Sequence, residues 1–475
     1  MVKVGIIGAG PAGMTAAYEL TKAGVKVEVF EGGPAIGGMS RSIDLWEQKV
    51  DLGPHRFFSN DSRVNRIWLE IAGRDYDMVD RLTRILYKNK FYYYPLRPFN
   101  ALKNLGLFEA VRCLTSYASE WIRPTKLGAT PTFEEWVISR FGRRLFTIFF
   151  KTYSEKLWGI KCADLDADFA AQRIKKFSLL EAIKSAFGLG SSKHKTLVDQ
   201  FAYPHGSTGI IYERMALKCK ENGGQVHLNT PVKRVVVENG RAVSVELSDG
   251  TARAFDHIIS SMPITHLVGR MDRVPQQTRD ALTQLKFRNT VIVFLRIGGH
   301  DLFKDNWIYV HSAELETGRI TNFRNWTPRI FGNSPDTVLA LEYWCYSNDA
   351  LWQRSDSDLV AQAKSEINKS GLLHGHTVLD GHVVRLENSY PVYARGYKEP
   401  LALVTDFLKG IENLSVIGRY GAFKYNNQDH SMLMGYLAAQ NICHGENNDL
   451  WNINTDYDYQ EASKITEVGL VPLHE

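Results

Sequence analysis

The first thirty residues pass from an apolar run through spaced glycines to a second apolar run. Residues 2–7 are mostly apolar and lead into three glycines, after which alanines and a leucine recur at helical spacing as far as Gly24. Residues 25–30 form the second run, which closes with Glu31. Short apolar runs on either side of a helical pattern predict a strand, a helix and a strand. We therefore predict a β-α-β unit here.

The remaining pattern divides the chain into helical and strand-rich parts. Residues 61–200 carry apolar side chains at helical spacing and are expected to be mainly helical, except for "GLGSSKHK" at 188–195, which predicts an exposed mobile loop. A helix is predicted over 211–221, followed by short strands around the turns "ENGR" and "SDGT". Residues 287–346 alternate in windows typical of an antiparallel sheet, and a last strand precedes Gly418.

Composition narrows the class of protein. A chain of 475 residues is long enough for two or three domains, and 44% hydrophobic with 23% charged residues is typical of a soluble globular protein. The net charge of +5 is mild, so it suits an anionic substrate without implying nucleic acid. The five cysteines are dispersed and favour neither a disulfide framework nor a metal site. No 18-residue apolar stretch occurs, so we expect a cytoplasmic protein without a transmembrane segment.

The three glycines of the predicted turn have the spacing of a dinucleotide site. Gly8 permits a tight turn, Gly10 allows a pyrophosphate to approach the backbone, and Gly13 lets the helix lie close to the strand. The helix N-terminus then offers free N–H groups and partial positive charge to the phosphates. Glu31 follows Gly13 by 18 residues, where a carboxylate accepts hydrogen bonds from ribose hydroxyls. We predict a dinucleotide cofactor at this turn.

Two further segments indicate which dinucleotide binds. "GGPAIGGMSRS" follows Glu31 and contains Gly38, Ser40 and Arg41, and "VDLGPHRFF" contains Gly53 and His55. These segments resemble the glutathione-reductase-like flavoproteins, especially the branch with amine oxidases, protoporphyrinogen oxidase and UDP-galactopyranose mutase. The resemblance implies FAD rather than NAD, with the first segment beside the pyrophosphate and the second beside the isoalloxazine. It also places Val232, in the later strand-rich stretch, against the cofactor.

The loop "GRYGAFKYNNQDHS", residues 418–431, precedes an apolar helical pattern. It resembles the corresponding loop of UDP-galactopyranose mutases, which carries an Arg-Gly segment, a tyrosine, an asparagine and an Asp-His-Ser entering a helix. The resemblance implies cofactor contacts for Gly418, Asp429 and Ser431. It implies contacts with a nucleotide pyrophosphate for Tyr425 and Asn427.

Scattered segments extend the resemblance to the mutases. It implies that Tyr94, Trp158 and Tyr390 line the substrate pocket, and that Arg173 and Arg296 bind the pyrophosphate and, with His55, act in catalysis. A buried, unpaired guanidinium within the apolar strand around Arg296 would be costly without an anion or carboxylate. Trp158 could equally be a core residue after an amphipathic helix, and Arg173 could be a solvated helix residue beside two lysines.

The predicted fold class is α/β, with a Rossmann-like FAD-binding domain, a helical insertion and an antiparallel sheet domain over the flavin. The FAD-binding domain is expected to combine residues 1–70, 201–270 and 401–445. The helical insertion with its mobile loop covers residues 71–200, and the sheet domain covers residues 271–400. Residues 446–475 form a C-terminal tail.

Two mechanistic classes fit such a site. The resemblance favours a pyranose/furanose mutase that acts on a nucleotide-diphosphate sugar and uses N5 of reduced FAD as a covalent nucleophile, with NAD(P)H as electron donor. The alternative is an oxidoreductase of the protoporphyrinogen oxidase or amine oxidase type, in which FAD accepts a hydride. Clustered arginines and tyrosines favour the first class, because a diphosphate carries charge and many acceptor oxygens. The sequence reveals neither the sugar nor the oligomeric state.

Overall fold

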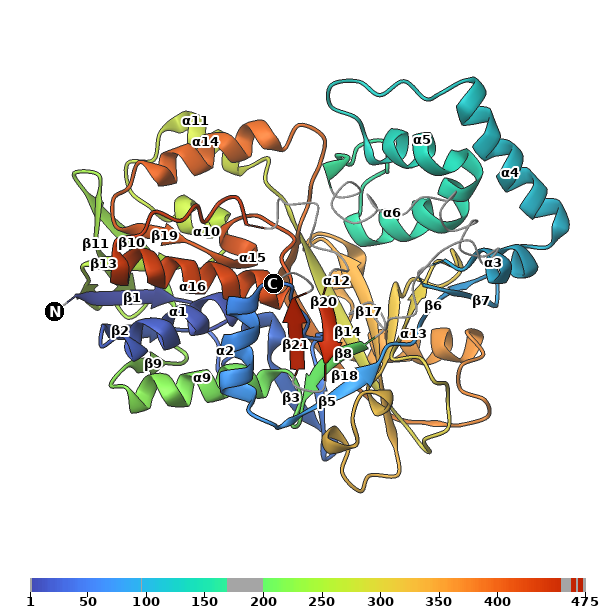
Figure 1. Ribbon diagram of the computed structural model, residues 1–475, viewed down its shortest axis with the longest axis horizontal. Coiled ribbons are helices and arrows are strands. Elements are labelled where there is room, and N and C mark those ends of the chain that lie inside the picture. The colour runs from blue at the N-terminus through green and yellow to red at the C-terminus, as the bar shows by residue number, and fades with distance from the viewer. Residues whose placement is uncertain (1, 95, 169–199, 454–462, 467–468, 473–475) are drawn as a thin grey trace.

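The computed structural model describes residues 2–94, 96–168, 200–453, 463–466 and 469–472. One half of the molecule is built on a parallel sheet with helices, and the other half on a larger sheet with the helices of residues 98–158 beside it (Figure 1). Both halves draw on segments that are far apart in the chain. Within the described residues, no helix is both long and apolar enough to cross a bilayer.

The parallel sheet has five strands in the order β19-β13-β1-β2-β9, and every neighbouring pair is parallel. Its central strands are short apolar runs, because helices cover a parallel sheet and leave little room for polar side chains. The strands are β1 (Lys3–Ile7), β2 (Lys26–Phe30), β9 (Gln225–His227), β13 (His257–Ser260) and β19 (Leu414–Val416). The packed helices are α1 (Pro11–Lys22), α2 (Ser62–Ala72), α9 (Gly209–Glu221) and α16 (Gln428–His444).

Two glycines bring these helices close to their neighbours. A Cβ on Gly13 of α1 would lie 2.0 Å from the carbonyl oxygen of Gly8, so α1 can lie this close to the turn only without a side chain there. A Cβ on Gly435 of α16 would lie 2.2 Å from the carbonyl oxygen of Ala12 and 3.0 Å from the amide nitrogen of Ala16. The first and last parts of the cofactor half are therefore joined by backbone-to-backbone helix packing.

The second sheet has seven strands in the order β18-β14-β17-β16-β15-β6-β7. Every pair is antiparallel except β15 with β6, so the sheet is mixed, whereas the sequence pattern predicted an antiparallel one. The strands are β6 (Thr83–Tyr87), β7 (Lys90–Tyr93), β14 (Phe287–Ile297), β15 (Trp307–Val310), β16 (Arg319–Asn322), β17 (Thr337–Cys345) and β18 (Val378–Pro391). The predicted combination of a cofactor-type α/β sheet with a second sheet is confirmed.

The region from residue 61 to residue 200 is less helical than its apolar spacing predicted. β5 (Tyr76–Asp80) pairs with β8 (Gln200–Pro204), and β6 and β7 complete the large sheet. These runs of only four or five residues also satisfy a helical period, so periodicity alone could not identify them as strands. Residues 188–195, predicted as a mobile loop, lie outside the described residues.

A π-helix joins two of the helices beside the large sheet. α5 (Phe133–Leu145) begins at Thr132 with a capping box to Glu135, and a π-helix over Phe146–Lys151 joins it to α6 (Thr152–Trp158). Wide π-helical turns frequently occur at functional sites. The remaining helices of this part are α3 (Pro98–Leu105) and α4 (Leu107–Ile122).

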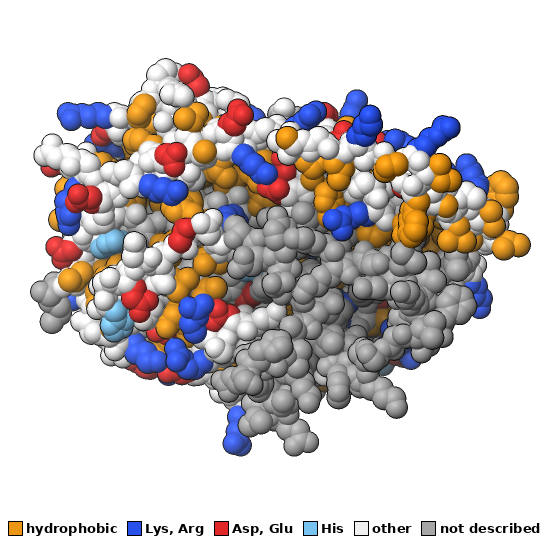
Figure 2. All heavy atoms as spheres, turned by 45° about the horizontal axis from the view of Figure 1, so that its top comes forward, with side chains coloured by type: hydrophobic (Ala, Val, Ile, Leu, Met, Phe, Trp, Pro, Cys, Tyr) orange, Lys and Arg blue, Asp and Glu red, His pale blue; other side chains and the backbone are white. Residues whose placement is uncertain are grey.

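One face of α4 is apolar and is not covered by another described part of the chain. Its buried residues are Ala110 and Cys113, and Cys113 belongs to a small core cluster with Ile85 and Tyr92 of the large sheet and Ile148 and Phe149 of the π-helix. Hydrophobic side chains gather at the end of the molecule that α4 forms (Figure 2), and those exposed on the helix are Leu107, Phe108, Val111, Leu114, Trp121 and Ile122.

The other described elements connect or cover the two halves. The strands are β3 (Ser42–Leu45), β4 (Gln48–Asp51), β10 (Val232–Glu238), β11 (Arg241–Leu247), β12 (Ala252–Ala254), β20 (Ser463–Thr466) and β21 (Gly469–Pro472). The helices are α10 (Ile264–Gly269), α11 (Gln276–Leu282), α12 (Ala350–Gln353), α13 (Asp356–Lys369), α14 (Lys398–Lys409) and α15 (Gly418–Gly421), with short 3-10 turns at Gly38–Ser40, Phe323–Asn325 and Pro328–Ile330.

The close packing of α1 on α16 makes a prediction about stability. Gly435→Ala is expected to lower the free energy of unfolding by about 1 to 3 kcal/mol, because the new methyl group must push two helix backbones apart. Gly128→Ala is the matched control, because a Cβ there meets nothing within 4 Å. Thermal unfolding of both variants checks this, and equal midpoints for the two would contradict it.

Candidate active site

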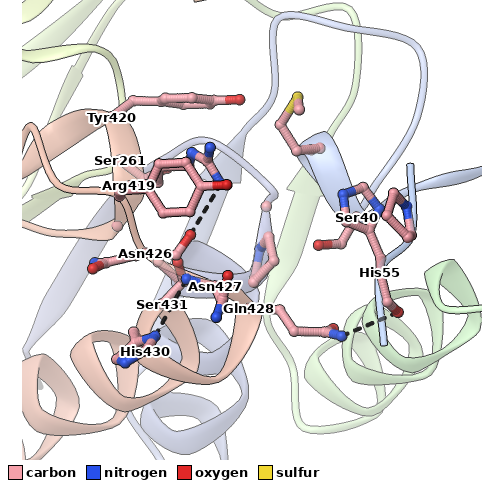
Figure 3. A pocket seen from close by; sticks show the side chains of 18 of the residues that line it. Ser40, His55, Ser261, Arg419, Tyr420, Asn426, Asn427, Gln428, His430 and Ser431 are labelled. Atoms are coloured by element: carbon pink, nitrogen blue, oxygen red, sulfur yellow. Dashed lines mark hydrogen bonds between the residues drawn. The ribbon is translucent and has the colours of Figure 1, made fainter. Parts of the chain in front are cut away.

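A large cavity of about 920 Å³ lies between the cofactor half and the large sheet. Its wall combines the turn after β1, the turn at Gly38–Ser40, strands β15 and β16, the π-helix and the loop ahead of α16. Figure 3 shows side chains from several of these segments facing one another. The volume is in the upper part of the range for small-molecule and cofactor sites.

Three backbone positions at one end of the cavity leave room for a phosphate. Gly8 and Gly38 have positive φ values of 98° and 54°, which residues with side chains rarely adopt. A Cβ on Gly38 would lie 3.1 Å from the Cα of Gly10, so the two turns approach each other at glycines only. The N-terminus of α1 opens onto the same space. This glycine cradle fits the pyrophosphate of a dinucleotide.

Glu31 stands at the end of β2 and lines the cavity. Its two carboxylate oxygens accept hydrogen bonds from the amides of Ala9 (2.8 Å) and Gly33 (2.9 Å). A carboxylate has about four acceptor positions, so these bonds orient the group and leave positions for ribose hydroxyls. The residue therefore suits its predicted role.

The cofactor residues predicted from the sequence divide into two sets. Those that line the cavity are Gly8, Gly10, Glu31, Gly38, Ser40, Val232, Gly418 and Ser431, and those outside its lining are Gly13, Arg41, Gly53 and Asp429. Residues of the second set lie behind the residues that line the cavity. Arg41 donates to the carbonyl of Gly38 (3.0 Å), and Asp429 is buried 3.3 Å from Nδ1 of His430.

His55 lines the cavity on a loop that two distant segments hold. Its carbonyl accepts from the hydroxyl of Thr208 (2.8 Å), and the side chain of Gln428 donates to the carbonyl of Arg56 (2.9 Å) and to that of His55 (3.4 Å; Figure 3). Tyr212 in turn donates to Gln428 (2.7 Å). Burial, followed by the positive charges of Arg319 and Arg419, lowers the pKa of His55 to about 3. The ring is therefore neutral near pH 7.

The loop over residues 418–431 builds the start of α16. Asn427 is the N-cap, and its amide donates to Nδ1 of His430 at 3.2 Å, which closes a capping box (Figure 3). Both residues line the cavity, as do Tyr425 and Ser431. Helix capping therefore explains part of the polarity of this loop.

Arg419 is the most unusual group in the loop. Its guanidinium lies over the rings of Tyr390 (4.5 Å) and Tyr425 (4.4 Å), and Nη1 donates to the carbonyl of Asn426 at 3.1 Å. Nε and Nη2 are buried and have no hydrogen-bond partner among the described residues. Because buried donors are costly to leave unpaired, this side of the guanidinium calls for an acceptor from a ligand.

The cavity has an excess of positive charge. Arg56, Arg81, Arg270, Arg319 and Arg419 line it, whereas Glu31 is the one acidic residue in the described lining. Arg319 is balanced from behind by a bidentate ion pair with Glu342, in which Nε lies 2.7 Å from Oε1. The wall thus favours an anion in addition to the cofactor.

The structure corrects the predicted role of Arg296. Its Nε lies 2.6 Å from a carboxylate oxygen of Asp336, and the residue does not line the cavity. The paired strand position on β14 directs it to a partner just before the start of β17 rather than to the site. The arginine that the sheet contributes to the cavity is Arg319 on β16.

The other predicted substrate residues have mixed outcomes. Tyr94, Tyr425 and Asn427 line the cavity. Trp158 does not, because it is fully buried against Tyr393, so the core alternative describes it better. Tyr390 also stands behind the wall, where it supports Arg419. Arg173 lies outside the described residues.

Several lining residues were missed in the sequence. Arg56 directly follows His55, Arg81 follows the short strand β5, which periodicity did not resolve, and Tyr309 lies on β15 within the stretch that was predicted as strands. Arg319 in "GRITNF" carried a usable signal, because a charged residue inside an apolar strand needs a partner. Its partner Glu342 is 23 residues away and could not be identified without the strand pairing.

Comparison with known proteins places the chain in a family. The sequence profile described as "Flavin containing amine oxidoreductase" matches residues 11–443, which include the His55 loop and the loop ahead of α16. The chain belongs to the flavin-containing amine oxidoreductase family. This membership implies FAD as the cofactor, and the glycine cradle with Glu31 fits it.

Individual relatives are distant and differ in activity. The chain is 23% identical over 412 residues to a 4,4'-diapophytoene desaturase of Methylomonas sp, covering 77% of this chain and 74% of that protein. It is 26% identical over 181 residues to a probable UDP-galactopyranose mutase of Klebsiella pneumoniae, covering 36% of this chain and 45% of that protein.

Solved structures share the fold over most of the chain. A reduced UDP-galactopyranose mutase superposes with a TM-score of 0.83 at 22% identity, covering 94% of this chain and 97% of that one. A putative protoporphyrinogen oxidase from Exiguobacterium sp. 255-15 superposes with a TM-score of 0.72 at 16% identity, covering 94% and 99%. At these identities the likeness shows a common fold.

Removal of the negative charge of Glu31 tests whether this carboxylate contributes to FAD binding. Glu31→Gln is expected to weaken FAD binding at least tenfold, about 1.4 kcal/mol, because ribose hydroxyls lose a charged acceptor. Titration of the apoprotein with FAD measures this affinity. The control is Glu28→Gln on the same strand, where the carboxylate pairs with Lys3 outside the cavity lining. Wild-type affinity in Glu31→Gln would contradict the assignment.

Proposed function

We propose that this protein is an FAD enzyme that acts on a nucleotide-diphosphate sugar, most simply as a pyranose/furanose mutase. The observation that carries the proposal is the buried edge of Arg419, where Nε and Nη2 have no partner among the described residues. The fold shared with a reduced UDP-galactopyranose mutase supports the choice of reaction.

The charge of the cavity supports an anionic substrate of this size. A nucleotide diphosphate brings about two negative charges and many acceptor oxygens. Charge-assisted hydrogen bonds contribute roughly 1.5 to 3 kcal/mol each, and guanidinium groups can make two at once. Arg319 and Arg419 both contact Tyr390, because Arg319 donates to its hydroxyl at 3.5 Å and Arg419 lies over its ring at 4.5 Å.

The protein's own groups have defined tasks in this proposal. Tyr390 and Tyr425 hold the guanidinium of Arg419 between their rings, which fixes its free edge towards the substrate. Neutral His55 contributes a polar ring without adding to the positive charge. The aromatic rings of Phe149, Phe150 and Tyr153, from the π-helix and α6, form an apolar wall that limits water.

FAD bound in the glycine cradle would supply the reactive N5 atom in its reduced form, with NAD(P)H as the electron donor. Because the ring interconversion is redox-neutral, the cofactor would need to be reduced once before the first turnover and not again in each later one. The chain's task is to hold the anomeric carbon of the sugar beside that atom.

A second candidate is an oxidoreductase that transfers a hydride to FAD. The apolar aromatic wall favours it, because such a surface suits a hydrocarbon or amine substrate, and the curated relatives include a desaturase and a probable flavin-containing monoamine oxidase A of Dictyostelium discoideum. The five lining arginines favour the nucleotide-sugar instead.

Ligand binding by the reduced protein tests the proposal. UDP-galactose is expected to quench or shift the fluorescence of the anaerobically reduced flavoprotein at submillimolar concentration, because the unpaired guanidinium edge gains an acceptor. Conversion to the furanose form, followed by NMR, is expected under the same conditions. The mutase proposal is contradicted if UDP-galactose and UDP leave the flavin fluorescence of both redox states unchanged while a hydrocarbon or amine substrate bleaches the oxidised flavin. The oxidoreductase candidate would then replace the mutase proposal.

A pair of arginine variants locates the binding charge. Arg419→Gln is expected to weaken UDP-galactose binding at least tenfold, about 1.4 kcal/mol. Arg296→Gln removes the same charge outside the cavity lining and is expected to leave this affinity unchanged. Loss of bound flavin from Arg419→Gln, with UDP-galactose affinity unchanged in the reconstituted protein, would assign Arg419 to the cofactor instead.

A further inference from the structure

A second unpaired guanidinium faces the cavity at Arg56. Its Nη1 is buried and has no hydrogen-bond partner among the described residues. The group packs over the ring of Phe58 at 4.3 Å and near that of Trp307 at 5.9 Å, and all three residues line the cavity. The rings fix the position of the charge but cannot accept the N–H of Nη1 in the way that an oxygen would.

Arg81 brings a second positive charge to the same place. It lines the cavity, and its Nη2 donates to the carbonyl of Tyr94 at 3.3 Å. No carboxylate forms an ion pair with Arg56 or Arg81 in the part of the chain that the structure describes. Burial, followed by the positive charge of Arg81, lowers the pKa of Arg56 to about 10, and Asp429 is the weakest of the acting groups.

This pair is separate from the pair formed by Arg319 and Arg419. Arg419 packs on Tyr390 and Tyr425 and Arg319 pairs with Glu342, whereas Arg56 packs on Phe58 and Trp307. The cavity therefore has two basic subsites, which differ in the side chains that hold their guanidinium groups.

A diphosphate that occupies the subsite of Arg319 and Arg419 leaves the subsite of Arg56 and Arg81 without an anion. The glycine cradle fits the cofactor's own pyrophosphate. A neutral sugar beside Arg56 would leave two like charges close together in a partly buried site without a counter-ion. A carboxylate would remove this cost, because its two oxygens match the planar fork of a guanidinium.

We propose that the sugar carries a carboxylate, so that the substrate is a nucleotide-diphosphate hexuronic acid whose carboxylate is bound by Arg56 and Arg81. The inference rests on the proposed function and makes it more specific. Phe58 and Trp307 hold the Arg56 guanidinium in place, while the subsite of Arg319 and Arg419 binds the diphosphate.

A matched pair of ligands tests the carboxylate. UDP-galacturonate and UDP-galactose differ only at carbon 6, where one has a carboxylate and the other a hydroxymethyl group. The FAD-loaded, reduced wild-type protein is expected to bind UDP-galacturonate at least ~tenfold more tightly. Arg56→Gln is expected to bring the two affinities to near equality and to leave the affinity for UDP unchanged, and Arg56→Lys to keep part of the preference.

The control is Arg63→Gln. Arg63 lies seven residues after Arg56 in the chain and forms a surface ion pair with Asp61. It is expected to keep the full preference for UDP-galacturonate. Equal binding of the two sugars by the wild-type protein would overturn the carboxylate inference while leaving the nucleotide-sugar proposal in place. Failure of UDP itself to bind would overturn the proposed function. A changed flavin reduction potential in Arg56→Gln, with the ligand preference intact, would assign Arg56 to the flavin.

Discussion

A buried guanidinium with an unused edge is the constraint around which the site is organised. Arg419 stacks against two tyrosines and gives one N–H group to the backbone, and Nε and Nη2 remain without a partner among the described residues. Folding must offset the cost of burying these donors, so the surrounding packing has to hold the charge in place until a ligand supplies the acceptor. Tyr390, which does not line the cavity, contributes to function in this way.

The same loop links this charge to the cofactor half. Arg419 belongs to a short helix that begins at Gly418, and a few residues later Asn427 caps α16. α16 packs on α1 through Gly435, and α1 carries the glycine cradle at its N-terminus. Gln428 connects α16 to the His55 loop. Displacement of α16 would therefore move the cofactor site and both neighbouring walls together.

The sequence was most informative where function depends on the backbone. The spacing of Gly8, Gly10 and Gly13 and the position of Glu31 were sufficient to predict the cofactor end, because each residue has a requirement that is local in the chain. The polar loop ahead of α16 was identified instead by its resemblance to the corresponding loop of UDP-galactopyranose mutases. Arg296 was predicted from the resemblance of its segment to the mutases, whereas the structure pairs it with Asp336 and places Arg319 of β16 in the cavity wall. Arg56 could not be identified, because its significance lies in a buried Nη1 without a partner among the described residues, which a sequence does not display.

The relatives include both a desaturase and a probable UDP-galactopyranose mutase, so the charge of the cavity has to distinguish hydride transfer from redox-neutral chemistry in this chain. The most direct measurement is a crystal structure of the FAD-loaded, reduced protein with bound UDP-galactose. We expect the FAD pyrophosphate between Gly10 and Gly38, and oxygen atoms of the nucleotide-sugar within hydrogen-bond distance of Nε and Nη2 of Arg419. A structure in which flavin atoms occupy both donors of Arg419, with no nucleotide-sugar in the cavity, would contradict the account.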